Sequence, residues 1–284
     1  DSYNKNKKEY CPTKIQQNII VGSVLGDGSL ALYGRSKNAY FRERGCEKQK
    51  EYRQWKCNQL SSLDFKLDGS GKLHSPSHPI YTNLYNKFYT VKGIKYISKD
   101  NIALLNHPIG LACLYMDDGT LVIDSSQGSR KKYLFPRIAI YTLCFSLEEN
   151  ILLQEHIQQT FHIPFKLKKR PDGKNYILEL NQRNYIFNFI DIIKPYVSQI
   201  PCMSYKINLN SRMVKLKGKL SGQDKEIIIR NKPIRDLTYS IEEERQIIAM
   251  KKIGSTDAKI ADRLKRSYWG VVDKVRRLRR IGKI

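Results

Sequence analysis

The same local pattern occurs twice in this chain, and it constrains the fold more than any other feature. In each copy an apolar run with small residues is followed by Asp, Gly, a hydroxyl-bearing residue and Leu, and the two aspartates are Asp27 and Asp118. Glycine commonly follows the last turn of a helix, and Pro108 suits the first turn of the second run. Each copy therefore predicts a buried helix that ends in a carboxylate, within one of two similar structural units.

The residues Tyr115-Met116-Asp117-Asp118 also spell a sequence found in the active sites of reverse transcriptases. In those enzymes the sequence lies on a β-hairpin, so the flanking residues should alternate between apolar and polar. Residues 108–116 are instead continuously apolar or small, which favours a helix. A polymerase also needs a further catalytic Asp on a separate strand, and the repeated pattern explains Asp118 without one.

The segments that follow the two motifs also correspond. In the first half we expect strands at residues 29–33, 39–44, 65–67 and 88–92, with a helix at 47–63. In the second half we expect strands at residues 120–124, 134–142, 165–169 and 175–180, with helices at 146–161 and 182–196. Ser146 and Glu149 are spaced as a capping box at the start of the first of these helices. Each unit is thus predicted to run helix, hairpin, helix, hairpin, helix.

The charge of the chain favours a polyanionic partner. The 284 residues include 51 Lys and Arg against 27 Asp and Glu, a net charge of +24, and nucleic acid is the first candidate. No apolar run is long enough to cross a membrane. The six cysteines form no CxxC pair, which predicts a reducing intracellular setting, either an organelle or a bacterial or phage-infected cytoplasm.

The composition changes near residue 212. Residues 212–284 hold 21 Lys and Arg against 9 Asp and Glu. Residues 212–238 contain Gly and Pro and predict a basic linker, whereas residues 239–284 predict three short helices. The third carries an apolar stripe at Val271, Val272, Val275 and Leu278. This unit resembles helix-turn-helix modules of the homeodomain type, and we expect it to contact DNA through Trp269, Lys274 and Arg277.

The paired motifs resemble the signatures of the LAGLIDADG homing endonuclease family. They read IVGSVLGDG at residues 20–28 and LACLYMDDG at residues 111–119, and the stretches FSLEENILLQEHIQQTFHI and IIKPYVSQIPCMSYKI resemble the second half of its single-chain, two-repeat members. The resemblance covers residues 13–210. It implies an α/β (α+β) fold of two pseudo-symmetric αββαββα repeats, residues 13–107 and 108–211, with paired central helices and DNA-binding antiparallel sheets. The linker (212–238) and a small three-helix domain (239–284) follow.

The resemblance also implies a metal site where the two motif helices end. Close packing of these helices requires small residues, here Gly22, Ser23, Gly26, Ala112 and Cys113. It would bring Asp27 and Asp118 together beside two negative helix ends, and these carboxylates would repel one another without a cation such as Mg²⁺ or Mn²⁺. In the family the residue before each motif aspartate offers its backbone carbonyl to metal. These residues are Gly26 and Asp117, although Asp117 stands where Gly or Ala is usual.

Two lysines complete the implied catalytic set. Lys95 and Lys206 match basic positions that flank the metals in the family, where they would order water or offset phosphate charge. The implied reaction is metal-assisted phosphodiester hydrolysis.

The hairpins are expected to carry the DNA contacts. Alternation within residues 39–44 places Tyr40, Arg42 and Arg44 on one face, and such a basic ribbon suits the major groove. The full set of expected contacts in the hairpins is Arg35, Lys37, Tyr40, Arg42, Arg44, Arg137, Tyr141, Lys166, Lys168 and Arg170.

These patterns favour a monomeric, site-specific double-strand DNA endonuclease with a long recognition site. Two alternatives stay open at this point. A non-catalytic regulator that combines a degenerate LAGLIDADG domain with a helix-turn-helix would have the same layout. An intron RNA maturase would keep the same fold and charge and would add intron RNA as a partner.

Overall fold

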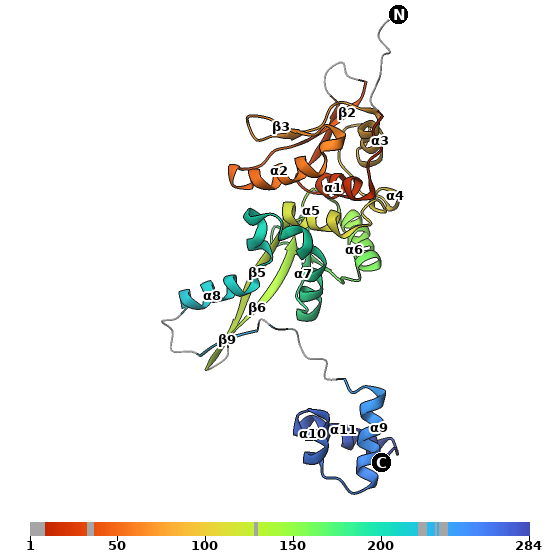
Figure 1. The fold of residues 1–284 in the computed structure, drawn as a ribbon, viewed down its shortest axis with the longest axis vertical. Helices are drawn as coiled ribbons and strands as arrows, with labels where there is room; N and C mark the ends of the chain where they lie inside the picture. The colour runs from red at the N-terminus through yellow and green to blue at the C-terminus, as the bar shows by residue number, and fades with distance from the viewer. Residues whose placement is uncertain (1–8, 33–36, 128–129, 221–225, 231, 233–237) are drawn as a thin grey trace, which may run out of the picture. The chain divides into compact units, whose positions relative to one another are not determined.

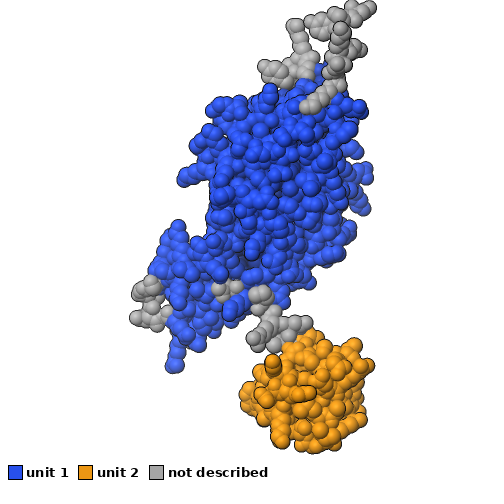
Figure 2. Space-filling model, viewed as in Figure 1, with its two compact units in different colours: residues 1–233 blue, residues 234–284 orange. Residues whose placement is uncertain are grey.

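The computed structural model describes residues 9–32, 37–127, 130–220, 226–230, 232 and 238–284. The chain forms two compact units, residues 1–233 and residues 234–284, which are coloured blue and orange in Figure 2. Among the described residues, no helix combines the length and the apolar character needed to cross a bilayer.

The first repeat of unit 1 has the predicted order of elements. It contains helix α1 (Lys14–Leu25), strands β1 (Ser29–Leu32) and β2 (Ala39–Glu43), helix α2 (Lys50–Gln59), strands β3 (Lys66–Leu67) and β4 (Leu73–His74), and helix α3 (Pro79–Phe88). Thr13 and Gln16 form a capping box at the start of α1. The short helix α4 (Lys99–Ile102) leads from this repeat into the second one (Figure 1).

The second repeat follows the same order. It contains helix α5 (Pro108–Asp118), strands β5 (Gly119–Gln127) and β6 (Lys131–Ile140), helix α6 (Leu147–Phe161), strands β7 (Lys166–Lys169) and β8 (Tyr176–Leu180), and helix α7 (Arg183–Val197). The capping box at Ser146 and Glu149 is present. The αββαββα order of both repeats confirms the predicted fold class.

Each repeat builds one antiparallel sheet with the same strand arrangement. The strand orders are β1-β2-β4-β3 in the first sheet and β5-β6-β8-β7 in the second. In β2, Ala39 and Phe41 are buried while Tyr40 and Arg42 point outward to different degrees, so the predicted alternation is correct. One face of β2 therefore packs into the core and the other face is more exposed.

The central helices α1 and α5 pack very closely. A Cβ atom added to Gly22 would lie 2.2 Å from the carbonyl oxygen of Gly110, and one added to Gly26 would lie 2.6 Å from the Cβ of Asp117. These distances are far below ordinary contact, so glycine is required at both positions. The small residues predicted on α1 thus lie at the interface, and Gly110 is the matching residue on α5.

Two segments differ from the prediction. Residues 88–92 were expected to form a strand because they are aromatic and β-branched, but Phe88 ends α3, a helix that Pro79 opens at its first turn. The predicted basic linker at 212–238 begins inside helix α8 (Leu209–Leu220), whose Leu209 and Met213 are buried. The same segment contains strand β9 (Glu226–Ile229), which pairs in parallel with β6. Tertiary packing stabilises both α8 and β9. The sequence did not predict them because the segment is rich in charged residues.

Unit 2 consists of three short helices around a separate apolar core. They are α9 (Ile241–Lys252), α10 (Asp257–Leu264) and α11 (Tyr268–Arg280). Their buried residues include Ile247, Ile260, Val271, Val275 and Leu278. The predicted stripe on the third helix is therefore correct except for Val272, which is half-buried.

Candidate active site

Asp27 and Asp118 lie at the ends of the two packed helices. Asp27 follows Gly26, the C-terminal cap of α1, and Asp118 is the last residue of α5. Asp27 is exposed and Asp118 is half-buried. Burial raises the pKa of Asp118 to about 6, and the negative charge of Asp27 contributes to the increase. The two carboxylates that the sequence predicted to meet are therefore near enough to repel one another.

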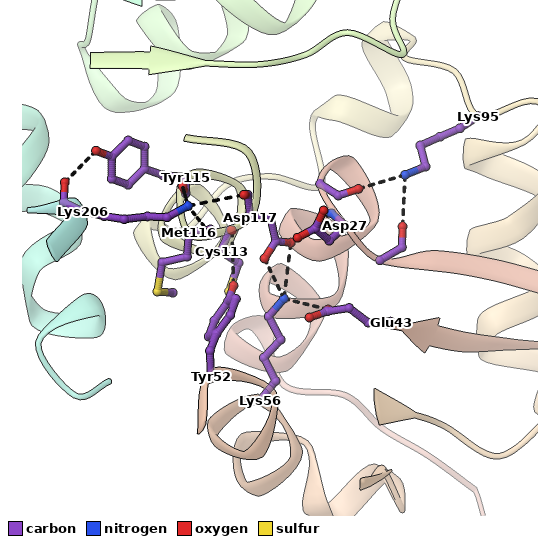
Figure 3. Close-up of polar contacts among 12 residues, drawn as sticks. Asp27, Glu43, Tyr52, Lys56, Lys95, Cys113, Tyr115, Met116, Asp117 and Lys206 are labelled. Carbon is purple, nitrogen blue, oxygen red and sulfur yellow. Dashed lines mark hydrogen bonds and ion pairs between the residues drawn. The ribbon is translucent and has the colours of Figure 1, made fainter. Parts of the chain in front are cut away.

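Lys95 reaches the end of the first motif helix. Its ammonium donates hydrogen bonds to the carbonyl oxygens of Gly26 at 3.2 Å and Gly28 at 3.0 Å (Figure 3). Burial lowers the pKa of Lys95, whereas Asp118, Asp117 and Asp27 act in the opposite direction. A half-buried lysine ammonium thus lies beside the motif carboxylates and fixes the turn that carries Asp27.

Lys206 likewise donates hydrogen bonds to backbone carbonyls at the end of the second motif helix. Its ammonium donates to the carbonyl oxygens of Asp117 at 3.4 Å and Gly119 at 2.9 Å, and also to the carbonyl of Met116. Asp117 and Gly119 correspond in the repeat to the two residues that Lys95 contacts. The Tyr115 hydroxyl in turn donates to the Lys206 carbonyl at 2.7 Å. The structure therefore brings both predicted lysines to equivalent places in the two repeats.

The side chain of Asp117 is fully buried and ion-paired, which the sequence did not predict. Lys56 on α2 places its ammonium 3.1 Å from one carboxylate oxygen of Asp117 and 2.7 Å from a carboxylate oxygen of Glu43. The backbone N–H of Asp27 donates to the other oxygen of Asp117 at 3.3 Å. Figure 3 shows this buried ion cluster of Glu43, Lys56 and Asp117 between the two repeats.

Lys56 remains charged within this ion cluster. Burial lowers its pKa, but the carboxylates of Asp117 and Glu43 raise it by more, so the net shift is upward. One signal for the cluster was present in the sequence. Glu43 falls on the buried face of the predicted strand together with Phe41, and a buried carboxylate requires a cationic partner.

The oxygen atoms at the two helix ends suit a hard divalent cation. The set consists of the carboxylates of Asp27 and Asp118 and the carbonyls of Gly26 and Asp117. Each carbonyl oxygen has two lone pairs, so a hydrogen bond from lysine leaves one available. Within the described ranges, no cluster of three or more His, Cys, Asp or Glu could hold a metal. Two carboxylates with carbonyls and water match the preference of Mg²⁺, which keeps several waters.

Two of the predicted DNA contacts of the first repeat, Arg42 and Arg44, lie beside Asp27. Asp27, Ser29, Arg42 and Arg44 line a depression of about 360 Å³. Lys37 is exposed and Tyr40 is half-buried on the outward face. Arg35 lies outside the described residues. Two arginine side chains thus lie next to one motif carboxylate. Arginine is one of the residues that commonly contact the phosphate oxygens of DNA.

The predicted contacts of the second repeat are more strongly paired. Arg137 binds Asp124 at 2.5 Å and Glu179 at 3.0 Å, and Lys168 binds the same Glu179 at 3.0 Å. Lys166 is exposed. The remaining two residues lie together, with the Arg170 guanidinium 5.9 Å from the ring centroid of Tyr141.

In unit 2 the three predicted contacts lie in different surroundings. Trp269 is 74% exposed and Arg277 is also exposed. Lys274 forms an ion pair with Glu244 of α9, and its side chain is 18% exposed. Lys274 therefore holds α11 against α9.

The sequence of this chain matches the model of a known protein family. Residues 17–187 match the model of the LAGLIDADG DNA endonuclease family. This match includes both motif aspartates and covers more than half of the chain. The protein therefore belongs to the LAGLIDADG DNA endonuclease family, and the match ends before unit 2.

Curated relatives and a solved structure resemble the chain over part of its length. The chain is 26% identical over 199 residues to a protein named RecA from Mycobacterium shimoidei, which covers 68% of this chain and 46% of that protein. It is also 26% identical over 200 residues to RecA from Mycobacterium leprae (strain TN), covering 68% and 27%. The chain thus spans about half or less of these relatives. The homing endonuclease I-WcaI, solved bound to its DNA recognition sequence, shares the fold with a TM-score of 0.57 at 20% identity, over 71% of this chain and 89% of that one.

Proposed function

We propose that this protein is a site-specific double-strand DNA endonuclease that hydrolyses phosphodiester bonds with a divalent metal, Mg²⁺ or Mn²⁺. One arrangement carries the proposal. Asp27 and Asp118 end two packed helices within range of mutual repulsion, and Lys95 and Lys206 bind the carbonyls beside them. A protein with only a structural role has no need for two repelling carboxylates, because either aspartate could be replaced at a helix end without loss of packing.

The site residues have two proposed roles, metal binding and positioning. Asp27 and Asp118, with the carbonyls of Gly26 and Asp117, would hold the metal, and the bound metal would supply an activated water and charge stabilisation at the leaving oxygen. Lys95 and Lys206 keep the carbonyl-bearing turns fixed and place positive charge near the phosphate.

The bound partner is proposed to be a long duplex. The net charge of +24 favours contacts with DNA phosphates. Arg42 and Arg44 line the same depression as Asp27, and we propose that they make such contacts. The two sheets offer one outward face in each repeat, and a two-stranded ribbon fits the major groove. Both motif carboxylates come from a single chain, so we propose that the monomer is the active form.

Cleavage of a randomised DNA library with Mg²⁺ tests this function. We expect the wild-type protein to cut rare sites on both strands and the Asp27→Asn and Asp118→Asn variants to bind the same sites without cutting. Tight DNA binding by a wild-type protein that never cuts would instead identify a regulator. Splicing of an intron RNA stimulated equally by all three proteins would identify a maturase.

A further inference from the structure

Helix α11 of unit 2 has sharply separated faces. Val271, Val275 and Leu278 are buried in the core of the unit. Trp269 precedes Val271 by two residues, which places it on the opposite side of a helix with 3.6 residues per turn. The residues that share this outward side, at the i, i+4, i+7 and i+11 spacing, are Trp269, Asp273, Arg276 and Arg280. We call these four residues the α11 stripe.

Three acidic residues elsewhere in unit 2 form ion pairs within the unit. Glu243 binds Arg266 at 2.8 Å, Glu244 binds Lys274, and Asp257 binds Lys251 at 2.5 Å. In contrast, Arg277, Arg279 and Arg280 are exposed and form no ion pair with the described residues. The positive charge of these three arginines is therefore uncompensated, whereas Arg276 forms an exposed ion pair with Asp273 at 3.2 Å.

The connection between α10 and α11 is that of a helix-turn-helix. Three residues, Lys265, Arg266 and Ser267, join the two helices. Lys265 adopts a left-handed backbone conformation with φ of 51°, and the Ser267 side chain caps α11. In such units the N-terminal residues of the second helix contact base edges and the first helix crosses the backbone. The Tyr268 and Trp269 rings, with centroids 5.2 Å apart, occupy that N-terminal end.

We propose that unit 2 is a second binding module for double-stranded DNA, which enters the major groove with the α11 stripe. Trp269 and Arg276 would face base edges, and Arg280 with Arg277 and Arg279 would contact phosphates. This goes beyond the nuclease function, because the family match ends at residue 187. We do not assign Lys274 to the contact surface, because its ammonium is ion-paired with Glu244 and its side chain is only 18% exposed.

A second module changes how the whole chain binds DNA. When two binding surfaces are linked in one chain, the second contact becomes intramolecular and the overall affinity exceeds that of either surface alone. The α11 stripe should therefore contribute affinity and additional protected base pairs, whereas Asp27 and Asp118 would hold the metal proposed for hydrolysis. The two roles are separable by substitution.

The test uses the full chain with Asp118→Asn in every protein, so that no DNA is cut. A variant that adds Arg276→Ala and Arg280→Ala removes two stripe cations. We expect its Kd for duplex DNA to increase at least about tenfold. The slope of log Kd against log salt should fall by about 0.9, because Arg280 is the one phosphate-contacting residue that this variant removes. Hydroxyl-radical footprints should also become shorter.

The matched control removes the same charge from another face. Arg245→Ala with Lys252→Ala changes two exposed cations of α9, and we expect a Kd within about twofold of the parent. The positions substituted in this test other than Asp118 are exposed, namely Arg245, Lys252, Trp269, Arg276 and Arg280. The fold should therefore be preserved, which circular dichroism checks. Trp269→Ala should weaken binding at a specific site more than on random duplex.

Two results would overturn the proposal. One is an equal loss of affinity in the stripe variant and in the α9 control. The other is tighter binding of unpaired RNA than of duplex DNA that depends on the same stripe. Neither result bears on cleavage by the protein with Asp118 intact, so failure of this proposal is distinguishable from failure of the nuclease function.

Discussion

The ammonium nitrogen of Lys56 lies 3.1 Å from a carboxylate oxygen of Asp117, and both side chains are fully buried. Lys56 belongs to the first repeat and Asp117 to the second, so this ion pair joins the repeats. Asp117 also accepts the backbone N–H of Asp27. A side chain at the end of one motif helix thereby positions the backbone at the end of the other, directly beside the proposed metal ligands.

Replacing Lys56 by methionine should strongly destabilise the protein. The change leaves the buried carboxylates of Asp117 and Glu43 without their cation, and breaking a buried pair from one side costs about 3–5 kcal/mol. Denaturant unfolding of unit 1 measures the loss. The control is Lys50→Met on the same helix, whose side chain is 47% exposed and pairs with Glu47, and which should cost less than about 1 kcal/mol. Equal effects of the two variants would contradict a special role for Lys56.

Replacing Asp117 by glycine tests the role of its side chain separately from the role of its backbone carbonyl. The carbonyl that contacts Lys206 and the proposed metal remains, but the Asp27 N–H and Lys56 lose a charged acceptor. A hydrogen bond to a charged group contributes about 1.5–3 kcal/mol, so we expect cleavage to fall by about 10- to 100-fold. Asp118→Asn should abolish cleavage altogether. If single-turnover rates show the two variants to be equally inactive, Asp117 has a direct catalytic role and not a positioning one.

The features that the sequence predicted are those with local causes. The motif helices were recognisable because each is a continuous apolar run that ends in Asp-Gly, and the repeated order of elements followed from turn residues and capping boxes such as that at Ser146. Asp27, Asp118, Lys95 and Lys206 were placed by the paired motifs and the family resemblance, and the structure brings all four together.

The features that the sequence missed depend on distant residues. Nothing near Lys56 in the chain indicates that its partner is Asp117, since the pair forms only when α2 packs against the end of α5. Strand β9 likewise forms by pairing with Lys131–Leu134, far away in the chain. At Phe88 the β-propensity of aromatic residues was misleading, because tertiary contacts bury that side chain at the end of a helix.

The raised pKa of Asp118 predicts a stability change with pH. Burial and the charge of Asp27 raise the pKa to about 6 from its ordinary value of 3.8. The folded state therefore binds a proton more tightly than the unfolded state, and without metal the protein loses stability as pH rises from about 4 to about 6. Asp118→Asn should remove this loss and be more stable than wild type at pH 8 by about 1–3 kcal/mol.

Thermal or denaturant unfolding at several pH values measures this difference. The advantage of Asp118→Asn should vanish near pH 4, where the wild-type carboxyl is protonated. It should also shrink at pH 8 when Mg²⁺ is added, because a bound cation stabilises the wild-type folded state only. In parallel, Mg²⁺ affinity and cleavage should decline as pH falls through about 6. A constant difference between the two proteins from pH 4 to pH 8 would contradict the pKa shift.

Replacing Gly22 by alanine should force the two central helices apart. The new Cβ would lie 2.2 Å from the carbonyl oxygen of Gly110, and neither backbone has room to yield. Overpacking a buried interface costs about 1–3 kcal/mol or more, and the shift would also displace Asp27 relative to Asp118. We therefore expect both a lower unfolding free energy and slower cleavage. The control is Gly218→Ala on α8, where an added Cβ meets no atom within 4 Å. Alanine favours a helix over glycine by about 1 kcal/mol, so this control should be neutral or stabilising and should cleave normally. A Gly22→Ala protein as stable and active as that control would show that the helices tolerate a wider spacing than the structure indicates.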